Sequence, residues 1–363
     1  MLIQPIYIPI FRIKGCFQAY RRFLISFINA KLRAPKRIMS PKLILNDITA
    51  VLKDDIDALN SEITDNLNSD IELVNTISSH IISAGGKRLR PLLLLLVANA
   101  CGYEGSHHVR LAAIVELIHT ATLLHDDVVD LSELRRGMAT ANSLWGDQAA
   151  VLVGDFLYSR SFQMMVSIGN LRVMEILADA TNQISEGEVQ QLINIRNIKI
   201  SKDECLQIIA NKTARLFQAA ASLGAIIAGT DEKTVDNYSR FGTHLGIAFQ
   251  LIDDVLDYNS SNSDMGKSVG DDLAEGKPTM PLIHAMAAGK QYADIIEKAL
   301  EESSSIEVTA VIEAVNSSGA IEKTIAMAKT EISAAKKCLA KMSSNQYNKI
   351  LLQICDFALE RTF

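Results

Sequence analysis

The distribution of proline is the feature that most constrains the fold of this 363-residue chain. The seven prolines lie at positions 5, 9, 35, 41, 91, 278 and 281, so residues 92–277 contain none. Because proline breaks helix interiors and punctuates loops, a proline-free stretch of this length predicts one helix after another. Hydrophobic residues make up 48% of the chain and aromatic residues only 6%, so the predicted core is aliphatic. An all-β fold and a disordered chain are disfavoured.

Hydrophobic periodicity places the helices. Apolar residues recur at helical spacing from residue 47 to 82, and a glycine-containing break follows at 83–91. Pro91 suits the first turn of the next helix. The sequence predicts helices at 92–100, 109–129, 142–166, 171–193, 202–228, 232–258, 278–288, 292–302, 306–316 and 319–341. The breaks are short and no fixed repeat is present, so residues 39–363 are predicted to form one all-α domain.

Residues 1–38 differ from the rest of the chain in charge. They contain eight basic residues and no acidic one, and the first acid is Asp47. A targeting peptide or a membrane-surface helix would have such a composition, although no clear cleavage pattern follows it. The alternative is that translation starts at Met39. Residues 1–38 are therefore treated as a basic N-terminal extension outside the predicted domain.

Charge, hydropathy and cysteine content exclude several classes of protein. A net charge of −6 argues against nucleic acid as the main partner. No apolar run approaches the roughly 18 residues of a membrane-spanning helix. The five cysteines are scattered and form no CxxC pair, which favours reduced thiols in a cytoplasmic protein over a disulfide or zinc framework.

Two acidic motifs of the form DDxxD carry the functional signal. The first spans Asp126 to Asp130 and the second spans Asp253 to Asp257. Positions i and i+4 of a helix share a face, so each motif stacks like charges within an otherwise apolar segment. Such carboxylates are costly to bury unless cations neutralise them, and Mg²⁺ prefers oxygen ligands together with substrate phosphates. One copy is weak because chance and a solvated helix face explain it, but two copies are a strong indication of a metal site.

Basic residues accompany both motifs. Gly85 and Gly86 precede three cations within Lys87–Arg90, just before a predicted helix, which suits a diphosphate cradle. If it stood alone, a solvated basic turn would explain this segment better than a diphosphate cradle. His119 lies seven residues, or two turns, before Asp126, and Gln250 stands in the same relation to Asp257.

These segments together resemble the trans-isoprenyl diphosphate synthases. The motifs that carry the resemblance are GGKRLRP, LIHTATLLHDDVVD, RRG, KTARLF, FQLIDDVLDY and GDDLAEGKPTMPL, in the order and spacing of that family. The resemblance extends from about Met39 to the C-terminus. It implies a single large helical bundle around a central apolar cavity. It also implies head-to-tail condensation of an allylic diphosphate with isopentenyl diphosphate, and a homodimer.

The resemblance also implies a role for each site residue. Asp126, Asp130, Asp253 and Asp257 would bind Mg²⁺, with Asp254 and Lys212 among the catalytic residues. The allylic diphosphate would be held by Arg135, Lys212, Thr213, Gln250, Lys267 and Lys277. Isopentenyl diphosphate would be held by Lys87, Arg90, His119 and Arg136.

Product length should depend on the depth of the cavity below the first motif. Ala121 and Thr122 lie five and four residues before Asp126, where short-chain members of the family place an aromatic residue. The small side chain of Ala121 therefore predicts a long product, with Met164 and Met165 as candidates for a deeper floor. Within the family the motifs favour an octaprenyl product, made from farnesyl diphosphate, for ubiquinone or menaquinone side chains. Heptaprenyl and nonaprenyl products stay open.

Two other functions share this kind of sequence. A terpene cyclase or a head-to-head synthase would use a similar helical scaffold, but cyclases replace the second DDxxD motif and lack the GGKR segment. A non-catalytic subunit of a heteromeric synthase would lose one acidic motif or the basic segment. This chain retains all of these features, which favours chain elongation by the protein itself.

Overall fold

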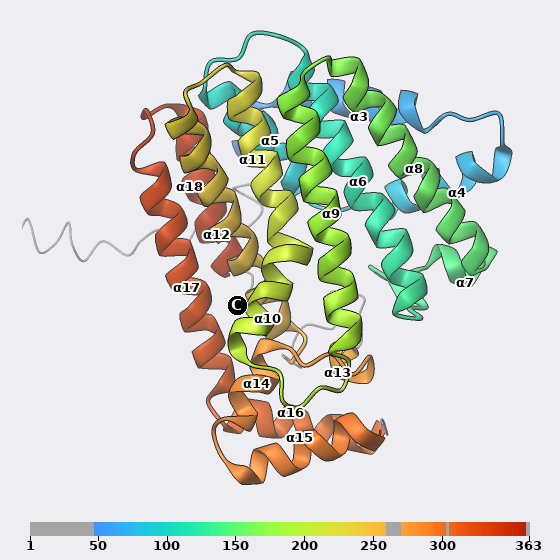
Figure 1. Cartoon of the computed structure of the whole chain (residues 1–363), viewed down its shortest axis with the longest axis vertical. Helices are drawn as coiled ribbons and strands as arrows, with labels where there is room; N and C mark the ends of the chain where they lie inside the picture. The colour runs from blue at the N-terminus through green and yellow to red at the C-terminus, as the bar shows by residue number, and fades with distance from the viewer. Residues whose placement is uncertain (1–46, 259–269, 303–304, 361–363) are drawn as a thin grey trace, which may run out of the picture. The chain divides into compact units, whose positions relative to one another are not determined.

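A computed structural model describes residues 47–258, 270–302 and 305–360. The N-terminal extension, the proposed start at Met39 and Lys267 lie outside these residues. The structure is helical apart from one two-stranded antiparallel hairpin, in which Leu134 pairs with Ala139. The predicted all-α class is therefore confirmed (Figure 1). None of the described helices is both long enough and apolar enough to cross a bilayer.

The helices follow the predicted order. The first half contains α3 (Lys53–Leu67), α4 (Glu72–Ser83), α5 (Leu89–Ala100), α6 (His107–Val129), β1 (Leu134–Arg135), β2 (Met138–Ala139), α7 (Ala141–Trp145), α8 (Asp147–Ile168) and α9 (Leu171–Ile193). The second half contains α10 (Lys202–Ile209), the π-helix η2 (Ala210–Ala214), α11 (Arg215–Ile227), α12 (Glu232–Leu256), α13 (Asp271–Ala274), α14 (Met280–Met286), α15 (Lys290–Glu302), α16 (Ser305–Ser317), α17 (Ala320–Leu339) and α18 (Gln346–Glu360).

Five details differ from the predicted elements. The segment 47–82 is divided at residues 68–71, and the segment 142–166 is divided at Gly146, whose φ is +84°. The predicted helix 202–228 contains the π-helix η2. The β-hairpin and the C-terminal helix α18 were not predicted. The hairpin strands have only two residues each, too few for an alternating hydrophobic pattern.

The core is built around α5 and α11. Both helices are buried along nearly their whole length, as expected for helices that are apolar on every side. Helix α11 packs against α5, α6, α9 and α12, and α12 also packs against α17. Figure 1 shows α11 between α9 and α12. The acidic motifs lie at the C-terminal ends of α6 and α12, and the core fixes the positions of these two helices.

Candidate active site

The first acidic motif lies at the end of α6, where two lysines from other elements approach it. Asp126 Oδ2 lies 3.9 Å from Lys212 Nζ, and Asp130 Oδ2 lies 2.7 Å from Lys277 Nζ. Burial raises the pKa of the Asp126 carboxyl, and Asp130 adds to the rise, whereas Lys212 opposes it. The two outer aspartates therefore form a buried anionic site on one face of α6, which we call the first ladder.

The middle aspartate of this motif has a different environment. Asp127 is fully buried, and its Oδ1 atom lies 2.6 Å from Arg135 Nη2 and accepts a hydrogen bond from Arg135 Nε at 2.8 Å. The backbone carbonyl of Asp127 accepts a hydrogen bond from Asn142. Asp127 therefore fixes the loop that carries Arg135 against the end of α6.

The second acidic motif lies at the end of α12, and we call Asp253 and Asp257 the second ladder. Asp257 Oδ2 accepts a hydrogen bond from the backbone N–H of Asp272 at 3.3 Å. The negative charge of Asp253 acts on Arg90 and favours its charged form. The second ladder is thus in contact with the segment after α12 and within electrostatic range of α5.

Asp254, predicted as a catalytic residue, is buried beside α12 and α14. Its Oδ1 atom accepts a hydrogen bond from Gln250 Nε2 at 2.9 Å, and the backbone of Met280 also bonds it. Burial raises the pKa of this carboxyl to about 8, and Asp272 adds to the rise. Gln250, two helical turns before Asp257, is hydrogen-bonded to Asp254 and Thr213. These contacts indicate that Asp254 orients the Gln250 side chain by accepting a hydrogen bond from its amide group.

Two connections join the helices of the two ladders, which we call the two walls of the site. In the π-helix η2, Lys212 approaches Asp126 of the first ladder, while Thr213 Oγ1 donates to Gln250 Oε1 at 2.9 Å on α12. In the segment after α12, Asp272 donates to Asp257, and Lys277 reaches Asp130. A π-helix adds a residue to a turn and is frequent at functional sites. Here consecutive residues of η2 contact opposite walls.

A separate basic pocket lies at the start of α5. Arg90 Nη1 donates to His119 Nε2 at 3.0 Å, and the Arg90 guanidinium lies 4.6 Å from the centre of the Phe217 ring. Burial lowers the pKa of His119 well below its usual range, and the charges of Arg90 and Arg136 lower it further. Since arginine only donates, His119 is neutral, with its proton on Nδ1. Burial also lowers the pKa of Arg90, to about 10, so the guanidinium remains charged at neutral pH.

The two glycines precede α5 in a turn that Arg136 approaches closely. A Cβ atom on Gly86 would lie 2.6 Å from Arg136 Nη1, so a side chain at residue 86 would displace this guanidinium. Binding of a diphosphate by this turn stays a prediction. Arg136 itself has a φ of +54°. Lys87 lies in the same turn, with Nζ 4.7 Å from the centre of the Phe357 ring on α18. Arg90, Arg136 and His119 therefore lie within electrostatic range of one another, and Lys87 follows Gly86 in the same turn. Their role in binding isopentenyl diphosphate stays a prediction.

Sequence reasoning missed four acidic or amide residues of the site. Glu116 on α6 lies 3.9 Å from Arg88, and burial raises its pKa while Arg88 and Arg90 lower it. Three others contact the two lysines: Glu188, Gln191 and Glu275. The sequence feature that could have indicated the contact between α9 and Lys212 is Gly187. A glycine inside a helical pattern often marks close packing.

The residues predicted to set product length lie along α6 and α8. Ala121 is fully buried and precedes His125 by one turn, and His125 Nε2 contacts the carbonyl of Val151 on α8 at 3.2 Å. Ala121 therefore faces α8, on which Met164 and Met165 are buried. Thr122 lies one turn before Asp126 and shares the face of the first ladder. The central apolar cavity itself stays a prediction.

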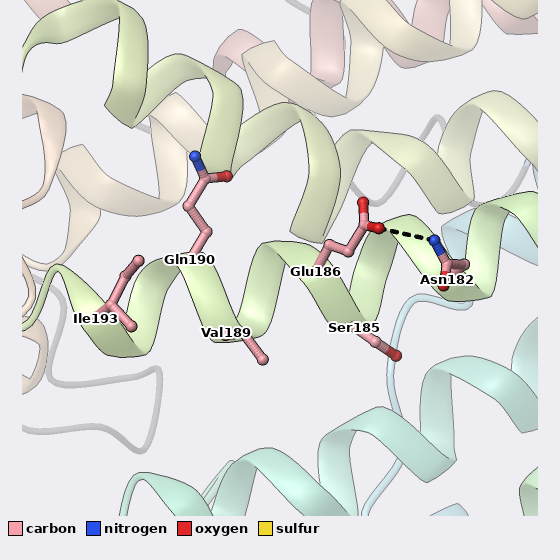
Figure 2. Close-up of a pocket in the computed structure, with 6 residues that line it drawn as sticks. All are labelled: Asn182, Ser185, Glu186, Val189, Gln190 and Ile193. Carbon is pink, nitrogen blue, oxygen red and sulfur yellow. Dashed lines mark hydrogen bonds between the residues drawn. The ribbon is translucent and has the colours of Figure 1, made fainter.

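An open hollow lies on a different face of α9 from the one that contacts Lys212. Figure 2 shows that its lining comes from this one helix: Asn182, Ser185, Glu186, Val189, Gln190 and Ile193. Asn182 Nδ2 donates to Glu186 Oε1 at 2.9 Å. Two of these lining side chains are apolar and exposed to solvent: Val189 is 58% exposed and Ile193 is 73% exposed.

Comparisons with known proteins agree with this geometry. The polyprenyl synthetase family profile matches residues 71–317. The chain belongs to the polyprenyl synthetase family. It is 46% identical over 319 residues to the octaprenyl diphosphate synthase of Escherichia coli (strain K12), which covers 87% of this chain and 98% of that protein. It is 43% identical over 318 residues to the geranyl-diphosphate-specific all-trans-nonaprenyl-diphosphate synthase of Rhodobacter capsulatus, covering 87% of this chain and 97% of that protein.

A solved structure is also similar along nearly the whole chain. The polyprenyl synthase of Caulobacter crescentus CB15, crystallised with calcium and isoprenyl diphosphate, has a TM-score of 0.86 and 40% identity. The match covers 91% of this chain and all of that one. The protein is therefore a prenyltransferase enzyme of the long-chain, all-trans type with the fold of the isoprenoid synthases. The predicted family and fold are confirmed.

Proposed function

We propose that this polyprenyl synthetase makes all-trans-octaprenyl diphosphate from farnesyl diphosphate and successive isopentenyl diphosphates. The observation that carries this proposal is the arrangement of two aspartate ladders on facing helices beside a separate pocket of arginines. The ladders and their lysines suit one diphosphate, and the basic pocket suits another. A site for two diphosphates is what condensation of an allylic with an isopentenyl substrate requires.

The ladders have the chemistry of a divalent-cation site. Two half-buried carboxylates on each wall supply the oxygen ligands that Mg²⁺ prefers. Among the described residues, no group of three or more acidic, histidine or cysteine side chains is close enough to bind a metal alone. This fits Mg²⁺, which usually binds one or two carboxylates, water and substrate phosphates. Asp126, Asp130, Asp253 and Asp257 would hold it, and when bound it would supply Lewis-acid stabilisation of the leaving pyrophosphate.

The cationic residues divide between the two substrates. Lys212, Lys277 and Arg135 surround the first ladder and would contact the allylic diphosphate, with Thr213 and Gln250 completing that wall. Lys267, predicted for the same role, remains a prediction. Lys87, Arg90 and Arg136 would bind isopentenyl diphosphate together with His119. A neutral His119 accepts from Arg90 and so holds that guanidinium without adding a further positive charge.

Octaprenyl length is supported by the relatives and by the small residue at position 121. The relatives include octaprenyl and nonaprenyl synthases, so neighbouring lengths are the alternatives. Use of the product for ubiquinone side chains and a cytoplasmic location also stay predictions.

The direct test uses the purified protein alone with farnesyl diphosphate and labelled isopentenyl diphosphate. We expect Mg²⁺-dependent incorporation, with a dephosphorylated product that co-migrates with an octaprenol standard in chromatography. A chelator should abolish incorporation, and restored Mg²⁺ should recover it. Turnover that survives removal of all divalent metal would contradict the metal assignment. A product of another length would contradict only the octaprenyl assignment.

We also propose that the protein is a homodimer, as the family resemblance implies. The outer faces of α8 and α9, which pack against each other, carry exposed apolar side chains. Leu152 is 66% exposed and Ile193 is 73% exposed. Contiguous exposed apolar surface is a common mark of an interaction site, and a second copy would bury the same faces from both sides.

Replacing Ile193 with aspartate should convert the dimer to a monomer. An unpaired charge at an apolar interface is costly to bury, so the equilibrium shifts towards separate chains. Light scattering coupled to size-exclusion chromatography measures the mass directly. The wild-type protein should have about twice the mass of the variant, while circular dichroism shows equal helicity. A wild-type monomer, or a variant that stays dimeric, would contradict this assignment of the interface.

A further inference from the structure

Two lysine side chains lie between the first ladder and two glutamates that belong to neither ladder. Lys212 Nζ lies 2.6 Å from Glu188 Oε2 on α9 and 3.9 Å from Asp126 Oδ2. Lys277 Nζ lies 2.6 Å from Glu275 Oε2 and 2.7 Å from Asp130 Oδ2. Each ammonium therefore has one partner in the ladder and one outside it.

The contacts of Lys212 fix the direction of its ammonium group. Lys212 Nζ donates to Glu188 Oε2 at 2.6 Å and to Gln191 Oε1 at 2.8 Å. Glu188 and Gln191 are three residues apart and lie on the same face of α9. An ammonium has three N–H groups, so two are bound by α9 and the third remains for the side of Asp126. Helix α9 therefore holds the Lys212 ammonium by two of its three N–H groups.

The packing of α9 against η2 brings these groups together. A Cβ atom on Gly187 would lie 2.8 Å from the backbone nitrogen of Lys212 and 2.9 Å from Asn211 Cβ. The two helices thus approach each other at a residue without a side chain. This close approach places Glu188 beside Lys212, and half-buried surroundings strengthen the ion pair between them.

The charge of Glu188 makes a direct role in binding a diphosphate unfavourable. Its carboxylate lies in the same anionic region as Asp126 and Asp130, and burial together with Asp126 raises its pKa to about 7. A further negative charge there repels a diphosphate. Any benefit to the reaction must therefore come through the cation that Glu188 orients.

We infer that Glu188 is a positioning residue that, with Gln191, directs the Lys212 ammonium towards the allylic diphosphate. Glu275 does the same for Lys277. This inference rests on the proposed function and deepens it, because it assigns residues outside both ladders to the allylic half of the site. Glu188 neither touches substrate nor binds metal in this role.

The test compares Glu188→Gln with Glu175→Gln under saturating Mg²⁺. Glu175 is also on α9, but it is exposed and forms an ion pair with Arg172, so its variant removes one charge from the same helix. We expect Glu188→Gln to lower kcat/KM for the allylic diphosphate about tenfold, the scale of one charge-assisted hydrogen bond. The KM for isopentenyl diphosphate should change less than about twofold, and Glu175→Gln should match the wild type.

A double-mutant cycle with Lys212→Ala identifies the route of the effect. If Glu188 acts through Lys212, Glu188→Gln should cause no further loss in the Lys212→Ala background. Equal losses in both backgrounds would overturn the inference and leave the proposed function intact. A higher Mg²⁺ requirement with full kcat at saturating Mg²⁺ would identify Glu188 as a metal ligand and also overturn it. If Lys212→Ala itself has wild-type kinetics, the allylic site of the proposed function is wrong.

Discussion

Replacing Asp126 with asparagine is expected to lower kcat by about three orders of magnitude, with little loss of stability. Removal of one ligand from a metal site that stabilises a leaving pyrophosphate costs several kcal/mol in the transition state. The folded state should tolerate the change because Asp126 is buried next to Asp130, and burial and this like charge raise its pKa. An amide of the same shape removes that repulsion.

The measurement is single-turnover condensation together with thermal unfolding of the same samples. Asp253→Asn tests the facing wall and should give a loss of similar size. Asp65→Asn is the matched control, since this carboxylate is exposed on α3 and accepts a hydrogen bond from Ser61. A loss of less than about tenfold in Asp126→Asn would contradict the role of the first ladder. A large drop in melting temperature would mean that the loss reflects folding.

The second large effect concerns product length. Ala121→Phe is expected to shorten the product sharply, because an aromatic ring at this position would block the growing hydrocarbon chain. The structure also places the two candidate positions on different faces of α6. Ala121 faces α8, whereas Thr122 shares the face of the first ladder. If the hydrocarbon extends below the ladder along α6, Thr122→Phe should shorten the product as well.

Chromatography of the dephosphorylated products measures this for both variants. Met165→Ala serves as the opposite test, since a smaller residue at a deeper floor should allow a longer product. Insertion of a ring into a packed core costs about 1–3 kcal/mol, so helicity and melting temperature must be measured alongside. Unchanged product length in both folded aromatic variants would contradict the assignment of these positions.

Local sequence determined the order of the helices and the two ladders. The proline-free stretch and the helical periodicity predicted most helices, and the i,i+4 spacing placed Asp126 beside Asp130 on one face. Helical spacing also placed His119 on the side of Asp126, two turns before it. Its pairing with Arg90 is a contact between α6 and α5 that spacing along one helix does not give. The missed helix α18 and the β-hairpin show the limit of periodicity, because the hairpin is too short for it to detect.

The sequence by itself determined that this protein is an all-α polyprenyl synthetase with two acidic motifs, because helical spacing and the motifs are local properties. Only the tertiary structure decided which residues join the two walls. Lys212 contacts Asp126 of the first ladder, whereas Thr213 contacts Gln250 on the helix of the second ladder. Glu188 reaches Lys212 across the close packing at Gly187. Such contacts link residues far apart in the chain, and they depend on how α9, η2 and α12 pack. Spacing along one helix cannot specify that packing.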